Sequence, residues 1–171
     1  MSALRLAMIP LGGLFVGVAA ALLVLAWRGA ASDTVLGQPK VERAAQRSLP
    51  RSGDPAWAVL RTTGIHQDLG KGVFRASYPA AVRAMAGHGL SITGYMLPLE
   101  AGQATHHFLL SKYTPVCPFC PPGEPNEVIE VRSESAIVPD TGLVMVTGRF
   151  SLQHDESAGL FFRLDGAEVS D

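Results

Sequence analysis

The chain has 171 residues, 47% of them hydrophobic, and a formal net charge of −1. From residue 55 onward, eight Lys and Arg residues stand against twelve Asp and Glu residues, a formal net charge of −4. Proteins that bind nucleic acid need a cationic surface that neutralises phosphates. The composition therefore argues against nucleic acid as a partner.

Residues 1–31 have the features of a membrane-spanning segment. Arg5 precedes an uncharged, apolar run, Leu6–Trp27, and Arg28 follows it. A helix needs about 20 apolar residues to cross a bilayer, and this run has that length. A cleaved signal peptide is the competing interpretation, because the small residues 29–31 offer a cleavage site. The length of the run favours an uncleaved single-pass anchor.

Both interpretations place the remainder of the chain outside the cytoplasm, because no later segment is apolar enough to return through a membrane. We expect a protein of the bacterial inner membrane whose domain faces the periplasm, or a periplasmic protein if the segment is cleaved. Residues 32–54 are polar and are predicted to form a solvated linker. Residues 55–171 have the size of a single domain with one hydrophobic core.

The domain is predicted to begin with two short helices. An Asp-Pro pair, a good N-cap followed by a proline, opens the first helix over residues 54–63. The second helix, over residues 78–89, begins with Pro79 and ends at a glycine. The segment between them is rich in turn residues and has room for a short strand around Val73.

After residue 89 the hydrophobic residues alternate with a period of two, which is typical of strands. The predicted strands lie at residues 90–97, 106–113, 127–132, 143–152 and 159–164. Gly94 and Gly148 fall inside the first and fourth strands, where glycine allows the sharp bend of a small barrel. The sequence predicts a mainly β fold, a small OB-like five-stranded barrel with one or two short helices, preceded by a transmembrane helix.

Several phrases of the sequence resemble a known family when they are taken together. They are YPAAVRAMAG, ITGYMLPLE, HFLLS, CPFCPPGEPNEVIEV, VTGRF and GLFFRLDGA, in this order. The set resembles an uncharacterised family of bacterial envelope proteins, a domain of unknown function, over most of the chain from about Trp57 to Ala167. The resemblance implies export or membrane anchoring, and it implies that some members accompany envelope transport systems linked to metal supply.

The resemblance also bears on one segment, the Cys-Pro loop CPFCPPGEPNE. Related members carry a cysteine with a nearby histidine, followed by prolines and an asparagine. Cys117 and Asn126 match this pattern, whereas Phe119 and Cys120 occupy the region of the histidine. A metal site shared with the family therefore requires that Cys120 replace the imidazole.

The two cysteines of the Cys-Pro loop allow three interpretations. Redox catalysis is disfavoured, because Cys120 runs into prolines that cannot begin the helix that activates a thioredoxin-like thiol. A disulfide suits an oxidising compartment, although it would close only a very short loop. The third interpretation is a soft-metal site, because Cys117 and Cys120 supply half of a tetrahedral thiolate set.

A metal site would need further ligands, and His106 or His107 is the best candidate in the sequence. Adjacent strand residues point to opposite faces, so only one of the two histidines is expected to contribute. Two thiolates with an imidazole favour zinc or copper, as the cuprous ion, over calcium or magnesium. Glu100, after the first predicted strand, is either a buried carboxylate near the loop or the polar end of that strand.

No nucleophile elbow, phosphate loop or metalloprotease motif is present in the sequence, and we expect no enzymatic activity. Two function classes remain. The first is a membrane-anchored envelope accessory protein that binds a soft metal and supports metal handling as a component of an envelope transporter. The second is a non-catalytic interaction module whose proline-rich loop is braced by a disulfide.

Overall fold

The computed structural model describes residues 34–35, 38–68, 73–115, 123–155 and 159–170. Two compact units are distinguished, residues 1–40 and residues 41–171. The predicted anchor at residues 1–31 lies outside the described residues and stays a prediction. Within the described ranges, no helix combines the length and the hydropathy that crossing a membrane requires. In the first unit, the short strands β1 (Thr34–Val35) and β2 (Gln38–Pro39) pair antiparallel.

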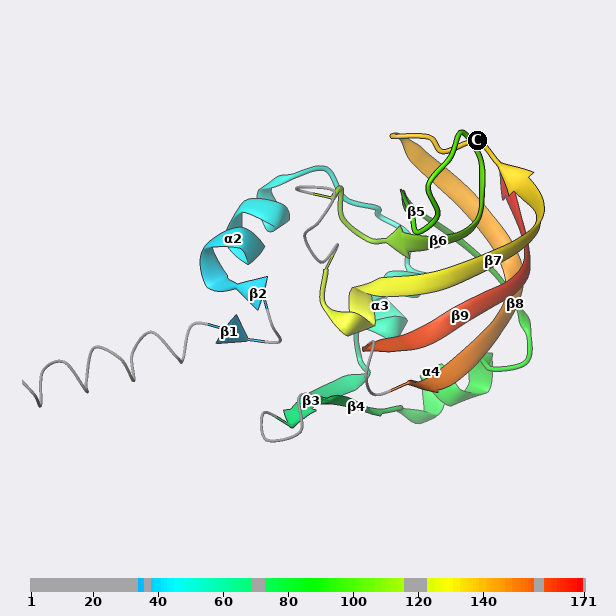
Figure 1. Cartoon of the computed structure of the whole chain (residues 1–171). Helices are drawn as coiled ribbons and strands as arrows, with labels where there is room; N and C mark the ends of the chain where they lie inside the picture. The colour runs from blue at the N-terminus through cyan, green and yellow to red at the C-terminus, as the bar shows by residue number, and fades with distance from the viewer. Residues whose placement is uncertain (1–33, 36–37, 69–72, 116–122, 156–158, 171) are drawn as a thin grey trace, which may run out of the picture. The chain divides into compact units, whose positions relative to one another are not determined.

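The second unit contains a closed five-stranded barrel (Figure 1). Its strands are β5 (Gly89–Pro98), β6 (Thr105–Ser111), β7 (Val128–Ile137), β8 (Leu143–Asp155) and β9 (Leu160–Ser170). They close in the order β5-β6-β7-β9-β8, with β7 and β9 parallel and every other pair antiparallel. The predicted mainly β, OB-like five-stranded barrel is confirmed. All five strands differ in extent from the predicted ranges, and β9 continues furthest beyond its predicted end.

The barrel core follows from the alternation of the sequence. Phe108 and Leu110 of β6 are fully buried, as are Ile129 and Val131 of β7, because alternate residues face the interior. Phe150, Phe162 and Leu164, on the last two strands, also have no exposed surface. Burial of these side chains is the main stabilising term of the domain.

The helix α3 (Ala56–Leu60) closes one part of this core. Trp57 is fully buried, and its indole Nε1 donates a hydrogen bond to the carbonyl oxygen of Thr93, 2.7 Å away. The carboxylate of Asp54 accepts hydrogen bonds from the backbone N–H groups of Ala56 and Thr93, both at 2.9 Å. The predicted helix start therefore also fixes α3 to strand β5. A second helix, α4 (Ala80–Met85), buries Val82 and is shorter than predicted.

Two further segments differ from the sequence-based expectation. The turn-rich segment forms an antiparallel pair, β3 (Gly64–Asp68) with β4 (Val73–Ser77), and only the second strand was predicted. Residues 40–48, within the segment predicted to be a polar linker, form helix α2 (Lys40–Ser48). Two of its polar side chains, Arg43 and Gln46, are buried. The sequence does not predict this helix because its buried face is polar rather than apolar. The partner of Arg43, Glu127, is 84 positions away.

Gly94 lies where β5 passes closest to β6. A Cβ atom at this position would lie 2.7 Å from Leu110 Cγ and 2.8 Å from the carbonyl oxygen of Ser111. Contacts below 3.0 Å do not occur for real Cβ atoms, and one of these partners is backbone. The predicted need for glycine at this bend thus has a steric cause.

We expect Gly94→Ala to destabilise the domain by about 1–3 kcal/mol, because the added methyl group forces the backbone of β6 to move. Urea-induced unfolding followed by circular dichroism measures this loss. Gly89→Ala is the matched control, because a Cβ atom at Gly89 has no neighbour within 4 Å. Equal stabilities of the two variants would show that the close approach is unimportant.

Candidate functional site

The Cys-Pro loop joins the end of β6 to the beginning of β7. Cys117 and Cys120 lie outside the described residues, but the chain is described up to Pro115 and again from Gly123. The described stretches on both sides of the loop are fixed to the body of the domain. The candidate site is therefore built from the residues that hold these two ends.

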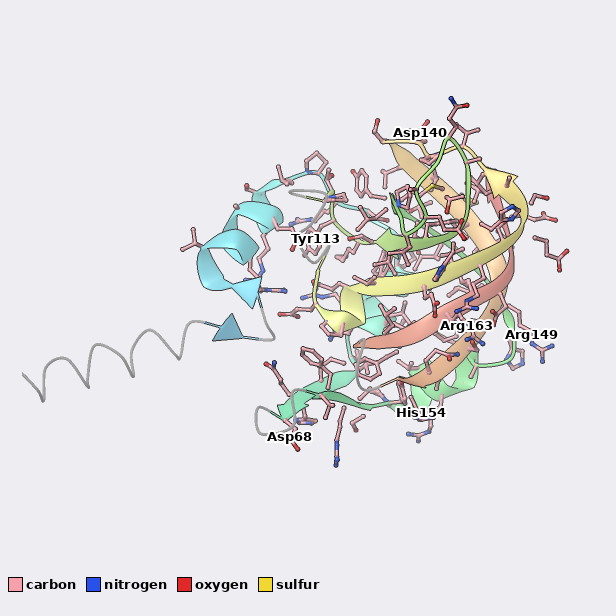
Figure 2. The ribbon with its side chains drawn as sticks, viewed as in Figure 1. Asp68, Tyr113, Asp140, Arg149, His154 and Arg163 are labelled. Atoms are coloured by element: carbon pink, nitrogen blue, oxygen red, sulfur yellow. The ribbon has the colours of Figure 1, made fainter. Side chains whose placement is uncertain are left out.

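The chain enters the Cys-Pro loop through residues 112–115, which we call the outgoing end. Residues that precede helix α3 hold this end in place. Lys112 accepts a backbone hydrogen bond from Ser52, with an N···O distance of 2.8 Å. Thr114 donates to the carbonyl oxygen of Pro50 through both its backbone N–H, at 3.2 Å, and its hydroxyl, at 3.0 Å. Arg51 and Tyr113 form an isolated β-bridge between these two contacts. Figure 2 labels Tyr113, whose ring is almost fully buried.

The returning end contains a buried carboxylate. The short 3-10 helix η1 (Pro125–Glu127) forms the last part of the loop, and the side chain of Glu127 is 1% exposed. Its Oε1 lies 3.0 Å from Arg61 Nε, and its Oε2 lies 3.4 Å from Arg43 Nη2. Arg43 Nη2 also lies 2.7 Å from Oε1 of Glu124. A buried charge is tolerated only when it is paired and hydrogen-bonded, and Glu127 meets both conditions.

We call Arg43, Arg61, Glu124, Asn126 and Glu127 the Glu127 cluster. Its two carboxylates and two guanidinium groups balance in charge. A reciprocal capping box adds a further bond, because the backbone N–H of Glu124 donates to Glu127 Oε2 at 3.2 Å. The cluster joins α2, the end of α3 and η1, so it fixes the point at which the chain returns from the loop.

Asn126 is placed in this cluster and is 9% exposed. Its Nδ2 donates to the carbonyl oxygens of Thr63, at 3.0 Å, and Arg61, at 3.3 Å. Its Oδ1 has no hydrogen-bond partner among the described residues. The predicted site residue Asn126 therefore anchors η1 to the segment after α3. These bonds support a positioning role for its amide.

Lys112 adds a cation beside the cluster. Its backbone N–H donates to the carbonyl oxygen of Glu127 at 3.0 Å. Burial, and then the nearby charge of Arg61, lower the pKa of the Lys112 ammonium group below its ordinary value. Lys112 Nζ lies 5.9 Å from the centre of the Tyr113 ring, a distance that suits a cation–π contact.

The two predicted histidine ligands lie at the other end of the β6–β7 pair. His107 Nε2 lies 2.8 Å from Glu130 Oε1, the oxygen that also accepts a hydrogen bond from Arg132 Nη2 at 3.0 Å. His106 Nδ1 lies 3.3 Å from the carbonyl oxygen of Ser133. The structure thus gives the two imidazoles different partners.

The register of the pair separates these histidines from the ends of the loop. His107 is opposite Arg132, whereas Ser111 is opposite Val128, next to the loop. Four residues of strand correspond to roughly 13 Å. The described ranges contain no group of three or more His, Cys, Asp and Glu residues able to hold a metal ion. The set of Cys117 and Cys120 with a histidine stays a prediction, and the described residues do not bring a histidine to the loop ends.

Glu100 is exposed and lies beyond the end of β5. The interpretation of Glu100 as a buried carboxylate is therefore wrong. Hydrogen bonds from the backbone N–H of His106, at 2.8 Å, and from the Thr105 hydroxyl, at 2.9 Å, lower its pKa below the ordinary value. Glu100 closes the connection between β5 and β6.

An apolar cleft of about 260 Å³ lies beside the outgoing end of the loop, and we call it the loop-side cleft. It is lined by Tyr95, Met96, Pro98, Thr114, Pro115, Pro139, Asp140 and Thr141. Asp140, which belongs to the β7–β8 connection, is labelled in Figure 2. Three large apolar residues next to the lining are exposed: Leu99 by 46%, Val138 by 75% and Leu143 by 49%. Exposed apolar residues that gather beside a cleft indicate an interaction surface.

Comparison with known proteins assigns a family. The model of a family described as "Protein of unknown function (DUF3299)" matches residues 42–165. The chain belongs to the DUF3299 family. The predicted membership of an uncharacterised family is thereby confirmed, whereas the envelope location stays a prediction. The matched span of the DUF3299 family includes Arg43 of helix α2 and the whole Glu127 cluster.

One solved structure is similar, the crystal structure of a DUF3299 family protein from Pseudomonas aeruginosa PAO1. It is 24% identical in sequence, with a TM-score of 0.47. The match covers 56% of this chain and 66% of that chain. No curated protein matches the sequence.

Sequence reasoning missed the Glu127 cluster. Glu127 was predicted to be an ordinary strand residue, and Arg43 to be part of a linker. The one local signal was the pair Glu124 and Glu127, which has the spacing of a capping box. The partners Arg43 and Glu127 are separated by 84 positions, so no local pattern could pair them.

We expect Glu127→Gln to reduce the free energy of unfolding by about 1–3 kcal/mol, because it removes the buried carboxylate that pairs with Arg43 and with the half-exposed Arg61. Urea-induced unfolding measures the change. Glu134→Gln is the control, because Glu134 is exposed and has no ion pair among the described residues. If both variants lose the same small amount, the buried pairing does not stabilise the domain.

Proposed function

We propose that this DUF3299 protein is a non-catalytic, membrane-anchored accessory protein of the bacterial envelope that presents the Cys-Pro loop and the loop-side cleft to a partner protein. The observation that carries the proposal is the exposed apolar surface beside Pro115, where the loop leaves the barrel. An uncharged apolar N-terminal run supports the anchor and the envelope location.

The fixed loop ends support the same proposal. The Glu127 cluster places buried charges at the point where the loop returns, and buried charges are costly unless every partner is in position. A loop whose ends are held by the body of a domain loses less conformational entropy when it docks. Both features suit the presentation of a loop for recognition.

Soft-metal binding is the second candidate function, and the spacing of Cys117 and Cys120 favours it. In that case the thiolates would hold zinc or the cuprous ion, and the protein would support metal handling in the envelope, as a component of a transporter. His106 and His107 would have to reach the loop from the far end of β6. The distance along the strand makes this the weaker of the two proposals.

Metal binding under reducing conditions separates the two functions. The full chain in neutral detergent micelles is compared with the variant Cys117→Ser/Cys120→Ser, and bound zinc and cuprous ion are measured after dialysis. For an interaction module we expect equal metal content in both proteins. One equivalent of metal bound to the native chain alone would overturn this proposal and support the metal function.

Site-specific photo-crosslinking in cells tests the interaction surface. A photoreactive amino acid at Val138 and, separately, at Leu143 should give the same adduct, because both exposed residues adjoin lining residues of the loop-side cleft: Val138 precedes Pro139, and Leu143 is opposite Tyr95. The same amino acid at Ala84, exposed on α4, is the control and should give no such adduct. Identical patterns at all three positions would contradict the assigned surface.

The orientation in the membrane is tested with reporters fused after Asp171. We expect a reporter that is active only outside the cytoplasm to be active, because no later segment returns the chain through the membrane. The matched fusion to a reporter that is active only in the cytoplasm should be inactive. The reverse result would contradict the envelope location.

A further inference from the structure

The barrel is closed along only part of the junction between β7 and β9. Their parallel pairing stops at Ser133 and Ala167, although β7 continues to Ile137 and β9 to Ser170. The register shifts at this point, and Gly166, with a φ of +58°, is the extra residue. Glycine adopts this left-handed conformation without strain, so the bulge turns the two strands apart.

Beyond the bulge, β9 is paired on one side only, and β7 is paired with β6 only at its last residue. β9 continues along β8, with Val169 opposite Val146, and β7 meets β6 again at Ile137, opposite Thr105. The edges of β7 and β9 that face each other have no strand partner among the described residues. Unpaired strand edges present backbone donors and acceptors that another strand can use.

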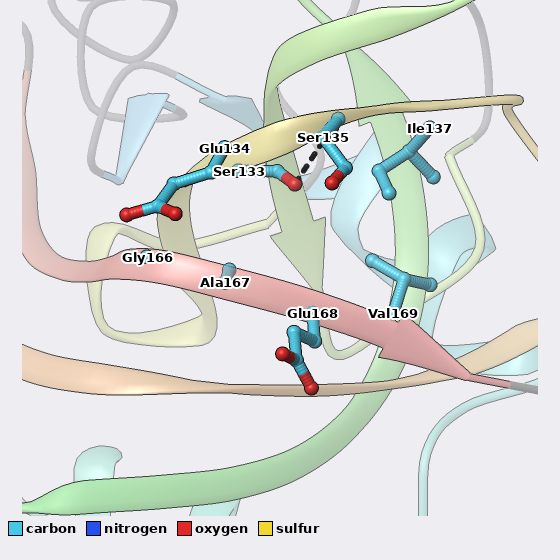
Figure 3. Close-up of a pocket in the computed structure, with 8 residues that line it drawn as sticks. All are labelled: Ser133, Glu134, Ser135, Ile137, Gly166, Ala167, Glu168 and Val169. Carbon is cyan, nitrogen blue, oxygen red and sulfur yellow. Dashed lines mark hydrogen bonds between the residues drawn. The ribbon is translucent and has the colours of Figure 1, made fainter.

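A cleft of about 360 Å³ lies between these edges, and we call it the split cleft (Figure 3). It is lined by Ser133, Glu134, Ser135, Ile137, Gly166, Ala167, Glu168 and Val169. In Figure 3, Ile137 and Val169 face each other across its apolar end. The Ser133 hydroxyl donates to the carbonyl oxygen of Ser135 at 2.7 Å, a local bond at an edge that lacks a neighbouring strand.

The split cleft is acidic. Glu134 extends from β7 and Glu168 from β9, and both are exposed. Neither carboxylate has an ion pair among the described residues. Two cations on these strands are already paired, Arg132 with Glu130 at 3.0 Å and Arg163 with Asp165 at 2.9 Å. A cationic ligand fits this surface, whereas phosphate groups and anionic lipid headgroups would be repelled.

We propose that the split cleft binds a basic, extended peptide segment of a partner protein by strand addition. Main-chain groups of the segment pair with the free edge of β7 or β9, as in other complexes formed by β-augmentation. An apolar side chain of the segment lies between Ile137 and Val169, and flanking Lys or Arg side chains pair with Glu134 and Glu168. The split cleft is separate from the loop-side cleft, so the two sites can be disproved independently.

Fluorescence anisotropy tests this site with the full chain in neutral detergent micelles. The probe is a fluorescein-labelled peptide of alternating lysine and valine, KVKVKV. We expect saturable binding, and at least tenfold weaker binding by the variant Glu134→Gln/Glu168→Gln. The control variant Asp68→Asn/Asp155→Asn removes two charges at residues that line neither cleft and should bind as the native chain does. Equal weakening by both variants would indicate nonspecific charge attraction and overturn the proposal.

A second probe tests strand addition with an unchanged protein. The same peptide with N-methyl groups on alternate backbone amides keeps its charges and side chains but loses the donors along one edge. We expect at least tenfold weaker binding of the methylated peptide. Equal affinity of the two peptides, or no binding of the KVKVKV probe at millimolar concentration, would overturn the proposal.

Discussion

The buried carboxylate of Glu127 is the interaction on which the organisation around the Cys-Pro loop depends. It is 1% exposed, and Arg61 and Arg43 provide its compensating charges from the end of α3 and from α2. A buried ion is costly without such partners, so the three elements must be in place together. Glu127 is also the last residue of the Cys-Pro loop, so its ion pairs connect the returning end of the loop to α2 and to the end of α3.

Closure of a small barrel is the second constraint, and it explains two local features. At Gly94, β5 approaches β6 so closely that a Cβ atom would lie 2.8 Å from the Ser111 carbonyl oxygen. At Gly166, the left-handed bulge ends the pairing of β7 with β9 and leaves two strand edges apart. The barrel is thus closely packed between β5 and β6 and separated between the ends of β7 and β9. The separated ends leave unpaired backbone groups along the split cleft.

The two clefts differ in the chemistry that they offer. The lining of the loop-side cleft includes prolines, Tyr95 and Met96, and three exposed apolar residues adjoin lining residues. The split cleft combines Ile137 and Val169 with the carboxylates of Glu134 and Glu168. The loop-side cleft suits an apolar ligand, and the split cleft suits a basic, extended peptide. The two surfaces therefore suit partners of different chemistry.

The sequence by itself indicated the family, through several characteristic phrases. It also predicted the strands and the barrel, because alternating apolar residues and strand glycines are local signals. It further predicted the start of α3 to within two residues, at Asp54 where the helix begins at Ala56. Only the tertiary structure decided the partners of Glu127, because Arg43 is 84 positions away. The same reason applies to His107, which the sequence proposes as a metal ligand: the pairing of β6 with β7 makes Glu130, from the neighbouring strand, its partner.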